Sequence, residues 1–360
     1  MSKFFNIFIN KIYKIFQQTY DLILFFPFQY KKKFNLEKFV RKYGLLRIYP
    51  DKYTYFRYLS KLGDQLNLKV KVKNSKNIIS IGTCFAEQIT EYLDHLHNVE
   101  EKTRTNSFGF AADWGRVTSI EHLFRLTKLY IDGDISKFYK IKSLKNLDNT
   151  SKNTLINSFK NLSPNFDYSK NKLFIDTSRE HLILHSSKSD FNKSITKHIK
   201  CARKVLNQCD TIFITIGQTG YFLDINNNFY AIKPPSIFME MESIKFIEEN
   251  MSSFSKLVNK LEISLENLRN SSSNAKLFIS LSPIPAFAYF GTNNKSVLEY
   301  HWYSKSILYQ VINQVISNDP SINYIPTFES VMSSNLTSIN DDLRHLKPWF
   351  RSRIFNNLLN

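Results

Sequence analysis

Three short clusters of residues could act together on an electrophilic carbonyl group. The first is Gly82-Thr83-Cys84, which directly follows a strand-like run at residues 77–81. Glycine permits a sharp turn there, and a helix starting after the turn offers free N–H groups that favour an anion. The position suits a nucleophile. In a purely structural interpretation, Thr83 caps the helix and Cys84 is a small buried apolar residue.

The second cluster, Gly217-Gln218-Thr219-Gly220, ends a strand-like run at residues 211–216. Its two glycines and two donor side chains could hold an oxyanion, although an ordinary turn has the same composition. Ser282 ends a further strand-like run and begins the sequence SPIP. We expect that sequence to form a rigid loop that shapes the cleft, with substrate contact as the alternative.

The third cluster is an acid and imidazole pair in the run DDLRHLKP. Asp342 and His345 lie three residues apart, so on a turn or helix start the carboxylate can orient the imidazole. Such a pair is the base half of a hydrolase. The same spacing alone is more often an inert surface feature, so its meaning depends on the other two clusters.

The elements that must position these clusters alternate between strand and helix patterns. The runs at residues 77–81, 211–216 and 276–281 are apolar and rich in β-branched residues, as expected for buried strands. Helical periodicity marks residues 194–206, 254–268 and 304–316. We therefore expect an α/β domain with a mostly parallel sheet and helices on both faces, spanning about residues 75–350. The polar stretch at about 137–190 is interpreted as an insertion or lid.

Composition excludes several classes of protein. The chain has 360 residues, of which 42% are hydrophobic and 15% aromatic, enough to fill a large core and too many for a mainly disordered chain. Three scattered cysteines give no disulfide framework or zinc site, and the other histidines lack metal-ligand spacing. There is no glycine-rich phosphate loop. We expect no metal and no cofactor.

The net charge of +18 would attract nucleic acid, anionic lipid or anionic glycan. Most lysines are scattered singly among asparagine, isoleucine and aromatic residues, so compositional drift is the simplest explanation. We expect no specific nucleic-acid partner.

Residues 1–74 are interpreted as a basic, partly amphipathic helical extension. Within residues 1–35, phenylalanine and isoleucine recur at helical spacing, and the apolar run at 22–28 is too short to span a membrane. One hypothesis is peripheral contact of this segment with an anionic membrane, and the other is packing of a helix on the main domain. The first hypothesis corresponds to a cytoplasmic protein at the inner face of the membrane.

In their order along the chain, the clusters resemble the SGNH hydrolase superfamily and, more narrowly, the GSCFA family, which is named after its N-terminal motif. The similar segments are IGTCFAEQI, SFGF with Gly109, TIGQTGYF, SLSPIPAFAYFGTNN with YSKSIL, YIPTFESVM and DDLRHLKP. The resemblance covers about residues 75–350. It implies a three-layer α/β/α arrangement of the SGNH type.

The resemblance also implies roles for individual residues. Thr83 stands where the family has its serine, Asp342 and His345 stand at the catalytic Asp-x-x-His, and Gly109 and Thr219 stand at the places of oxyanion donors. The methyl group of threonine restricts its χ1 angle and crowds attack on an ester. Nor is Thr219 the asparagine of many SGNH enzymes, and loss of one such donor can cost roughly a hundredfold in rate.

The expected activity is that of an esterase or O-acyltransferase acting on an acyl ester of a polysaccharide or cell-envelope glycan. In this scheme His345, oriented by Asp342, activates Thr83, and Cys84 is the alternative nucleophile because a helix N-terminus favours a thiolate. A second interpretation is a catalytically silent carbohydrate- or partner-binding protein that retains the fold.

Overall fold

A computed structural model of the chain divides into two units, Met1–Leu62 and Gly63–Asn360. The structure describes residues 55–73, 75, 77–86, 88–89, 92, 115–133, 139–143, 148–150, 153, 172–178, 183–231, 243–272, 275–286, 288–334, 339–340 and 345–359. The proposed amphipathic segment at residues 1–35 lies outside this part of the chain. Helix α4 (Tyr55–Gln65) spans the boundary between the units.

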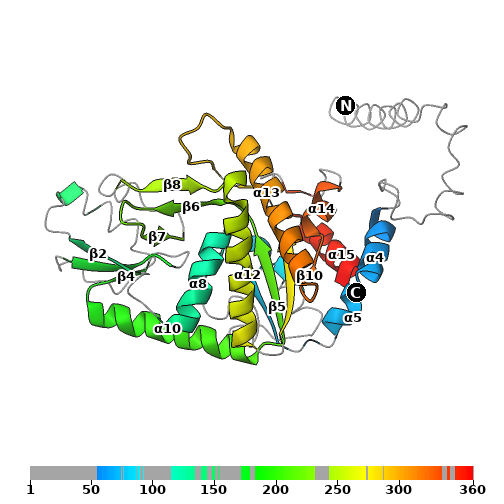
Figure 1. Ribbon diagram of the computed structural model, residues 1–360, viewed down its shortest axis with the longest axis horizontal. Coiled ribbons are helices and arrows are strands. Elements are labelled where there is room, and N and C mark those ends of the chain that lie inside the picture. The colour runs from blue at the N-terminus through cyan, green and yellow to red at the C-terminus, as the bar shows by residue number, and fades with distance from the viewer. Residues whose placement is uncertain are drawn as a thin grey trace, which may run out of the picture. The chain divides into compact units, whose positions relative to one another are not determined.

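The second unit contains a four-stranded parallel sheet (Figure 1). Its strands, in spatial order, are β1 (Ile78–Gly82), β5 (Thr211–Ile216), β9 (Lys276–Leu281) and β10 (Asn323–Tyr324). Nearly every residue of β1, β5 and β9 is buried, as continuous apolar runs require in a sheet covered on both faces. The prediction of an α/β fold with a parallel sheet is confirmed.

The register of the three long strands brings their carboxyl ends to one edge. Gly82 pairs with Thr215, and Thr215 pairs with Ser280 on the next strand. The residues that follow each strand, including Thr83, Gly217 and Ser282, therefore start from neighbouring positions. This edge is where open α/β sheets place reactive groups.

Long helices pack on the sheet through one continuous apolar cluster. They are α8 (Ile120–Asp132), α10 (Lys188–Gln208), α12 (Phe254–Ser271) and α13 (Val297–Asn318). Ile212, Ile214 and Ile216 of β5 enter this cluster, whereas Phe213 turns to the other face and stacks on Phe278 at 4.8 Å. This alternation follows from the two-residue repeat of a strand.

Serine caps fix the starts of three of these helices. Ser119, Ser187 and Ser296 each accept a hydrogen bond from a backbone N–H in the first turn, and Glu299 completes a capping box on α13. The helices extend beyond the periodic segments seen in the sequence, because capping residues and polar first turns carry no apolar repeat.

Two small antiparallel sheets accompany the parallel one. The segment interpreted as an insertion or lid contributes β2 (Tyr139–Ser143), β3 (Lys172–Asp176) and β4 (Ile183–His185). The other small sheet has the order β7 (Phe229–Tyr230), β6 (Gly220–Leu223), β8 (Lys245–Glu248), and it follows the Gly217–Gly220 loop. A short 3-10 helix, η3 (Met251–Ser253), leads from β8 into α12.

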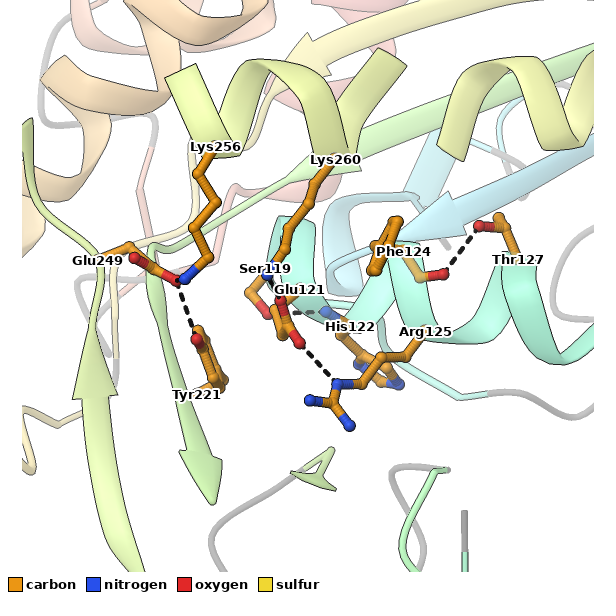
Figure 2. Close-up of polar contacts among 10 residues, drawn as sticks. All are labelled: Ser119, Glu121, His122, Phe124, Arg125, Thr127, Tyr221, Glu249, Lys256 and Lys260. Carbon is orange, nitrogen blue, oxygen red and sulfur yellow. Dashed lines mark hydrogen bonds and ion pairs between the residues drawn. The ribbon is translucent and has the colours of Figure 1, made fainter. Parts of the chain in front are cut away.

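A network of ion pairs fixes the start of α8 (Figure 2). Glu121 of α8, which is 5% exposed, pairs with Arg125 one turn later and with Lys260 of α12. These cations outweigh the effect of burial and lower the pKa of Glu121. Beside it, Lys256 of α12 pairs with Glu249, which also accepts a hydrogen bond from Tyr221. The first turn of α8 is thereby joined to α12.

The C-terminal part adds α14 (Thr327–Met332) and α15 (Pro348–Leu359), and α15 packs against α5 (Leu68–Lys73). Within the described residues, no helix combines the length and apolarity that crossing a membrane would need.

Candidate active site

The site begins with a turn that only glycine accommodates well. Gly82, the last residue of β1, has φ +151°. A Cβ at this position would overlap the carbonyl and hydroxyl oxygens of Thr215. The Gly82 carbonyl accepts a hydrogen bond from Val117 N at 2.7 Å. The chain therefore leaves the strand sharply and enters a helical turn at residues 84–86.

The hydroxyl of Thr83 lies in a buried cluster of three hydroxyl groups. Thr83 Oγ1 is hydrogen bonded to Ser282 Oγ at 2.8 Å and to Thr215 Oγ1 at 3.2 Å. It also accepts a hydrogen bond from Phe85 N at 3.3 Å, and Thr83 is 7% exposed. Thr83 thus ties together the carboxyl ends of β1, β5 and β9 and caps the following helical turn.

The thiol of Cys84 lies next to the imidazole of His345. Cys84 Sγ and His345 Nε2 are 3.9 Å apart, within hydrogen-bonding range for sulfur, and both side chains are partly buried. The two residues are separated by 261 positions in the sequence. The described hydrogen bonds thus join the imidazole to Cys84 and place the Thr83 hydroxyl with Thr215 and Ser282.

Packing of α15 brings His345 to this position. The Phe355 ring of α15 lies 5.6 Å from Phe85 and 5.1 Å from Tyr92, both in the segment after β1. Tyr92 also donates a hydrogen bond to Asn356 Oδ1 at 2.5 Å. Just before α15, Asn340 N donates to the His345 carbonyl oxygen at 2.8 Å. Contacts of α15 thus anchor the segment after the histidine, and the Asn340–His345 hydrogen bond closes a local turn before it.

The loop after β5 uses its backbone N–H groups to hold its own shape. Gly217 N and Gln218 N both donate to Thr118 O at 3.0 Å, and Thr219 N donates to Ser304 Oγ at 2.8 Å. Thr219 is 2% exposed. The Gln218 side chain is partly exposed, and its amide makes only long hydrogen bonds, at 3.3 and 3.4 Å. Of the groups expected to donate to an oxyanion from this loop, the Gln218 amide is the most available.

Gly217 also allows this loop to approach the turn after β1 closely. A Cβ on Gly217 would lie 2.5 Å from Thr83 Cγ2 and 3.4 Å from Thr118 O. Because both neighbours are packed in place, a side chain there would displace Thr83 and, with it, the adjacent thiol.

A buried lysine that the sequence interpretation did not identify lies beneath these loops. Lys305 of α13 is 2% exposed, and its Nζ donates to Gly217 O at 2.8 Å and to Ser282 O at 2.6 Å. A signal was present in the sequence: Lys305 precedes Leu308 by three residues and Ile312 by seven, which places it on the apolar face of the helix.

Burial dominates the electrostatics around this lysine. It lowers the pKa of Lys305 to about 7, and a negative charge on Cys84 acts in the opposite direction and favours the ammonium form. Burial likewise lowers the pKa of His301, on the same helix, to about 4, with a smaller contribution from Lys305. Near neutral pH, His301 is therefore uncharged.

Two residues assigned to the site from the sequence, Gly109 and Asp342, lie outside the described residues. Of the other predicted residues, Gly82, Thr83, Cys84, Gly217, Ser282 and His345 are brought together by the contacts above. Among the described residues, no group of three or more His, Cys, Asp or Glu side chains is arranged to hold a metal ion.

Comparison with known proteins gives one family. No curated protein and no solved structure matches the sequence. The sequence profile of the GSCFA family matches residues 77–357, which include β1, the Cys84–His345 pair and nearly all of α15. Since this match covers most of the chain, the protein belongs to the GSCFA family.

Proposed function

We propose that the protein is an SGNH-like esterase or O-acyltransferase in which Cys84 is the nucleophile and His345 the base. The observation that carries this proposal is the 3.9 Å approach of Cys84 Sγ to His345 Nε2 at the carboxyl end of β1. A thiol beside an imidazole at the start of a helical turn is an arrangement that activates cysteine for acyl transfer.

The contacts of Thr83 favour the thiol over the hydroxyl. The Thr83 oxygen already has three hydrogen-bond partners, and attack on a carbonyl would require it to leave them. Cys84, by contrast, is partly exposed and faces the base. In this proposal Thr83 positions the turn that carries the nucleophile.

The reaction proceeds by two acyl transfers. His345 Nε2 accepts the thiol proton as Cys84 Sγ attacks the acyl carbonyl, and the resulting imidazolium protonates the departing alcohol oxygen. This leaves a thioester on Cys84. His345 then takes a proton from water or a sugar hydroxyl, which attacks the thioester and releases the thiol. Asp342, three residues before His345, is proposed to orient the imidazole.

The substrate class proposed is an acyl ester of a polysaccharide or cell-envelope glycan. Membership of the GSCFA family and the resemblance of the three residue clusters to those of SGNH hydrolases support an acyl-ester substrate. The net charge of +18 favours an anionic polymer over a neutral one, since it raises the local concentration of such a partner.

Turnover of p-nitrophenyl acetate by single variants tests the nucleophile. We expect Cys84→Ala and His345→Ala to lower the rate by about 100-fold or more. Thr83→Val, which keeps the shape of the side chain and removes only the hydroxyl, should retain a measurable rate. Cys201→Ala serves as the thiol control, because Cys201 is exposed on α10.

Mass spectrometry of the acylated protein supplies the second readout. The proposal predicts an acetyl group on Cys84 of the unsubstituted chain at early times after mixing with the ester. Loss of turnover in Thr83→Val with normal turnover in Cys84→Ala would instead make Thr83 the nucleophile. If the chain without substitutions neither turns over nor becomes acylated by any tested ester, the result would support the alternative, a catalytically silent carbohydrate- or partner-binding protein.

A further inference from the structure

Lys305 is an ionisable side chain in a place where a positive charge is unfavourable, because burial opposes the ammonium form. It is 2% exposed, and its two hydrogen bonds go to the uncharged carbonyl oxygens of Gly217 and Ser282. Among the described residues, no carboxylate forms an ion pair with it. Burying an ammonium group without a counter-ion costs several kcal/mol, so an apolar residue here would be the more stable choice unless the charge has a use.

A negative charge on the Cys84 thiol favours the ammonium form of Lys305, because it raises the pKa of the lysine. This interaction is reciprocal, because a positive charge that is stabilised by a thiolate stabilises that thiolate equally. The two carbonyls that hold Lys305 also belong to residues that contact Thr83, the neighbour of Cys84. The lysine is thus fixed relative to the nucleophile by its own hydrogen bonds.

We propose that Lys305 is a positioning residue that serves as the buried counter-cation of the Cys84 thiolate. It holds the Gly217 and Ser282 carbonyls in place, and its charge favours the thiolate before substrate arrives. This inference deepens the proposed thiol mechanism and rests on it, but its test measures the thiol itself and requires no ester turnover.

The other titratable groups around the pair do not replace this charge. His345, from the segment before α15, faces Cys84 directly and is the base of the proposed reaction, so a variant that removes it is part of the test. His301, on α13 itself, is uncharged near neutral pH because its pKa is about 4. On α14, Phe328 faces Lys305 with its ring 6.0 Å from Nζ, and the neighbouring Glu329 accepts a hydrogen bond from Tyr324 at 2.6 Å.

The rate of alkylation by iodoacetamide as a function of pH tests the proposal, because only the thiolate reacts. Peptide mass spectrometry resolves the three cysteines in one experiment. Cys201 is exposed and provides an internal reference, whereas burial raises the pKa of Cys209 to about 11 and slows its reaction. The midpoint of each cysteine is the pH at which its alkylation rate reaches half of its maximum. In the unsubstituted chain, we expect the midpoint of Cys84 to lie at a lower pH than that of Cys201.

Lys305→Met should raise the midpoint for Cys84 by about 1 pH unit or more, which lowers its alkylation rate below the midpoint about tenfold. The matched control is Lys260→Met. Lys260, like Lys305, is a largely buried lysine. Its charge, however, is paired with Glu121 on α8. This control should lose stability without moving the Cys84 midpoint, and the Cys201 profile should be the same in all variants.

Two further variants separate charge from structure. Lys305→Gln keeps a donor for the carbonyls without the charge, and it should also raise the midpoint. In His345→Ala, Lys305 remains as the counter-cation, so the Cys84 midpoint should stay below that of Cys201 even if neither Lys305 variant folds. An unchanged midpoint in Lys305→Met or Lys305→Gln, or a Cys84 midpoint equal to that of Cys201 in His345→Ala, would overturn the proposal.

Discussion

At the scale of single residues, the turn after β1 depends on a conformation that other residues rarely adopt. Gly82 has φ +151°, and a Cβ there would overlap Thr215. We predict that Gly82→Ala lowers the free energy of unfolding by more than about 3 kcal/mol, because strain and overlap add. Gly133→Ala is the control: Gly133 has φ +69°, but its Cβ would meet only the flexible end of Arg203. That variant should cost about 1 kcal/mol in urea unfolding, and equal losses would contradict the argument.

A second residue makes the stability depend on pH. Burial, the largest cause, lowers the pKa of His122 to about 4, from 6.5 in the unfolded chain. His122 Nε2 is hydrogen bonded to Ser178 O, and Nδ1 has no hydrogen-bond partner among the described residues, so a second proton would be buried unpaired. Between pH 6.5 and 4 the unfolded state binds more protons, and the free energy of unfolding therefore falls as the pH falls.

We predict that His122 contributes a slope of up to about 1.4 kcal/mol per pH unit in that window. His122→Gln, whose amide can still donate to Ser178 O, should flatten the slope while leaving stability at pH 7 less affected. Urea unfolding at pH 5 and pH 7 measures both quantities. An identical slope in the variant would show that other groups cause the acid sensitivity.

The sequence predicted Thr83 as the nucleophile and Cys84 as the alternative, and the structure places the Cys84 thiol beside the histidine. Gly82, a hydroxyl and a thiol were assigned to the site from their position after a strand, whereas the histidine came from its spacing to Asp342 and from the resemblance to the GSCFA family. Which of two adjacent side chains faces the histidine depends on the turn at Gly82 and on the partners of Thr83, and these are set by β5 and β9. Lys305 was missed because a lysine on an apolar face is usually assigned to solvent.

At the scale of elements, the packing of α15 places His345, which lies just before this helix, beside Cys84. Phe355 is 1% exposed and packs on Phe85 and Tyr92, next to the nucleophile turn. We predict that Phe355→Ala lowers the free energy of unfolding by about 3–5 kcal/mol and reduces ester turnover in the fraction that remains folded. Trp349→Ala, on the same helix but 55% exposed, should change stability by less than about 1 kcal/mol. Similar losses in the two variants would argue against a specific packing role.

Elements with a long apolar repeat were predictable, and short ones were not. Strands β1, β5 and β9 were expected within one residue of their observed bounds, whereas helices α10 and α13 begin six and seven residues before the periodic segments that predicted them. The three short strands β2, β3 and β4 lie in a polar segment where five or fewer residues give too little periodicity to distinguish a strand from a loop. The pairing of β2 with β3 joins residues 29 to 37 positions apart, from Ser143 with Lys172 to Tyr139 with Asp176, and no local pattern encodes such contacts.

At the scale of the whole molecule, the remaining question is whether the charge of +18 acts as a diffuse field or through one segment. One of the two hypotheses drawn from the sequence is contact of residues 1–35 with anionic membranes, and in this segment Lys31, Lys32 and Lys33 follow the apolar run. Each lysine near such a surface contributes about 1 kcal/mol, so replacing these three by serine should weaken binding to phosphatidylserine vesicles by about 100-fold.

The matched variant replaces Lys188, Lys193 and Lys197, three exposed lysines of α10, by serine and changes the net charge equally. Cosedimentation at two salt concentrations measures both. Equal weakening by the two variants would show that the whole surface, and not the N-terminal segment, attracts the membrane.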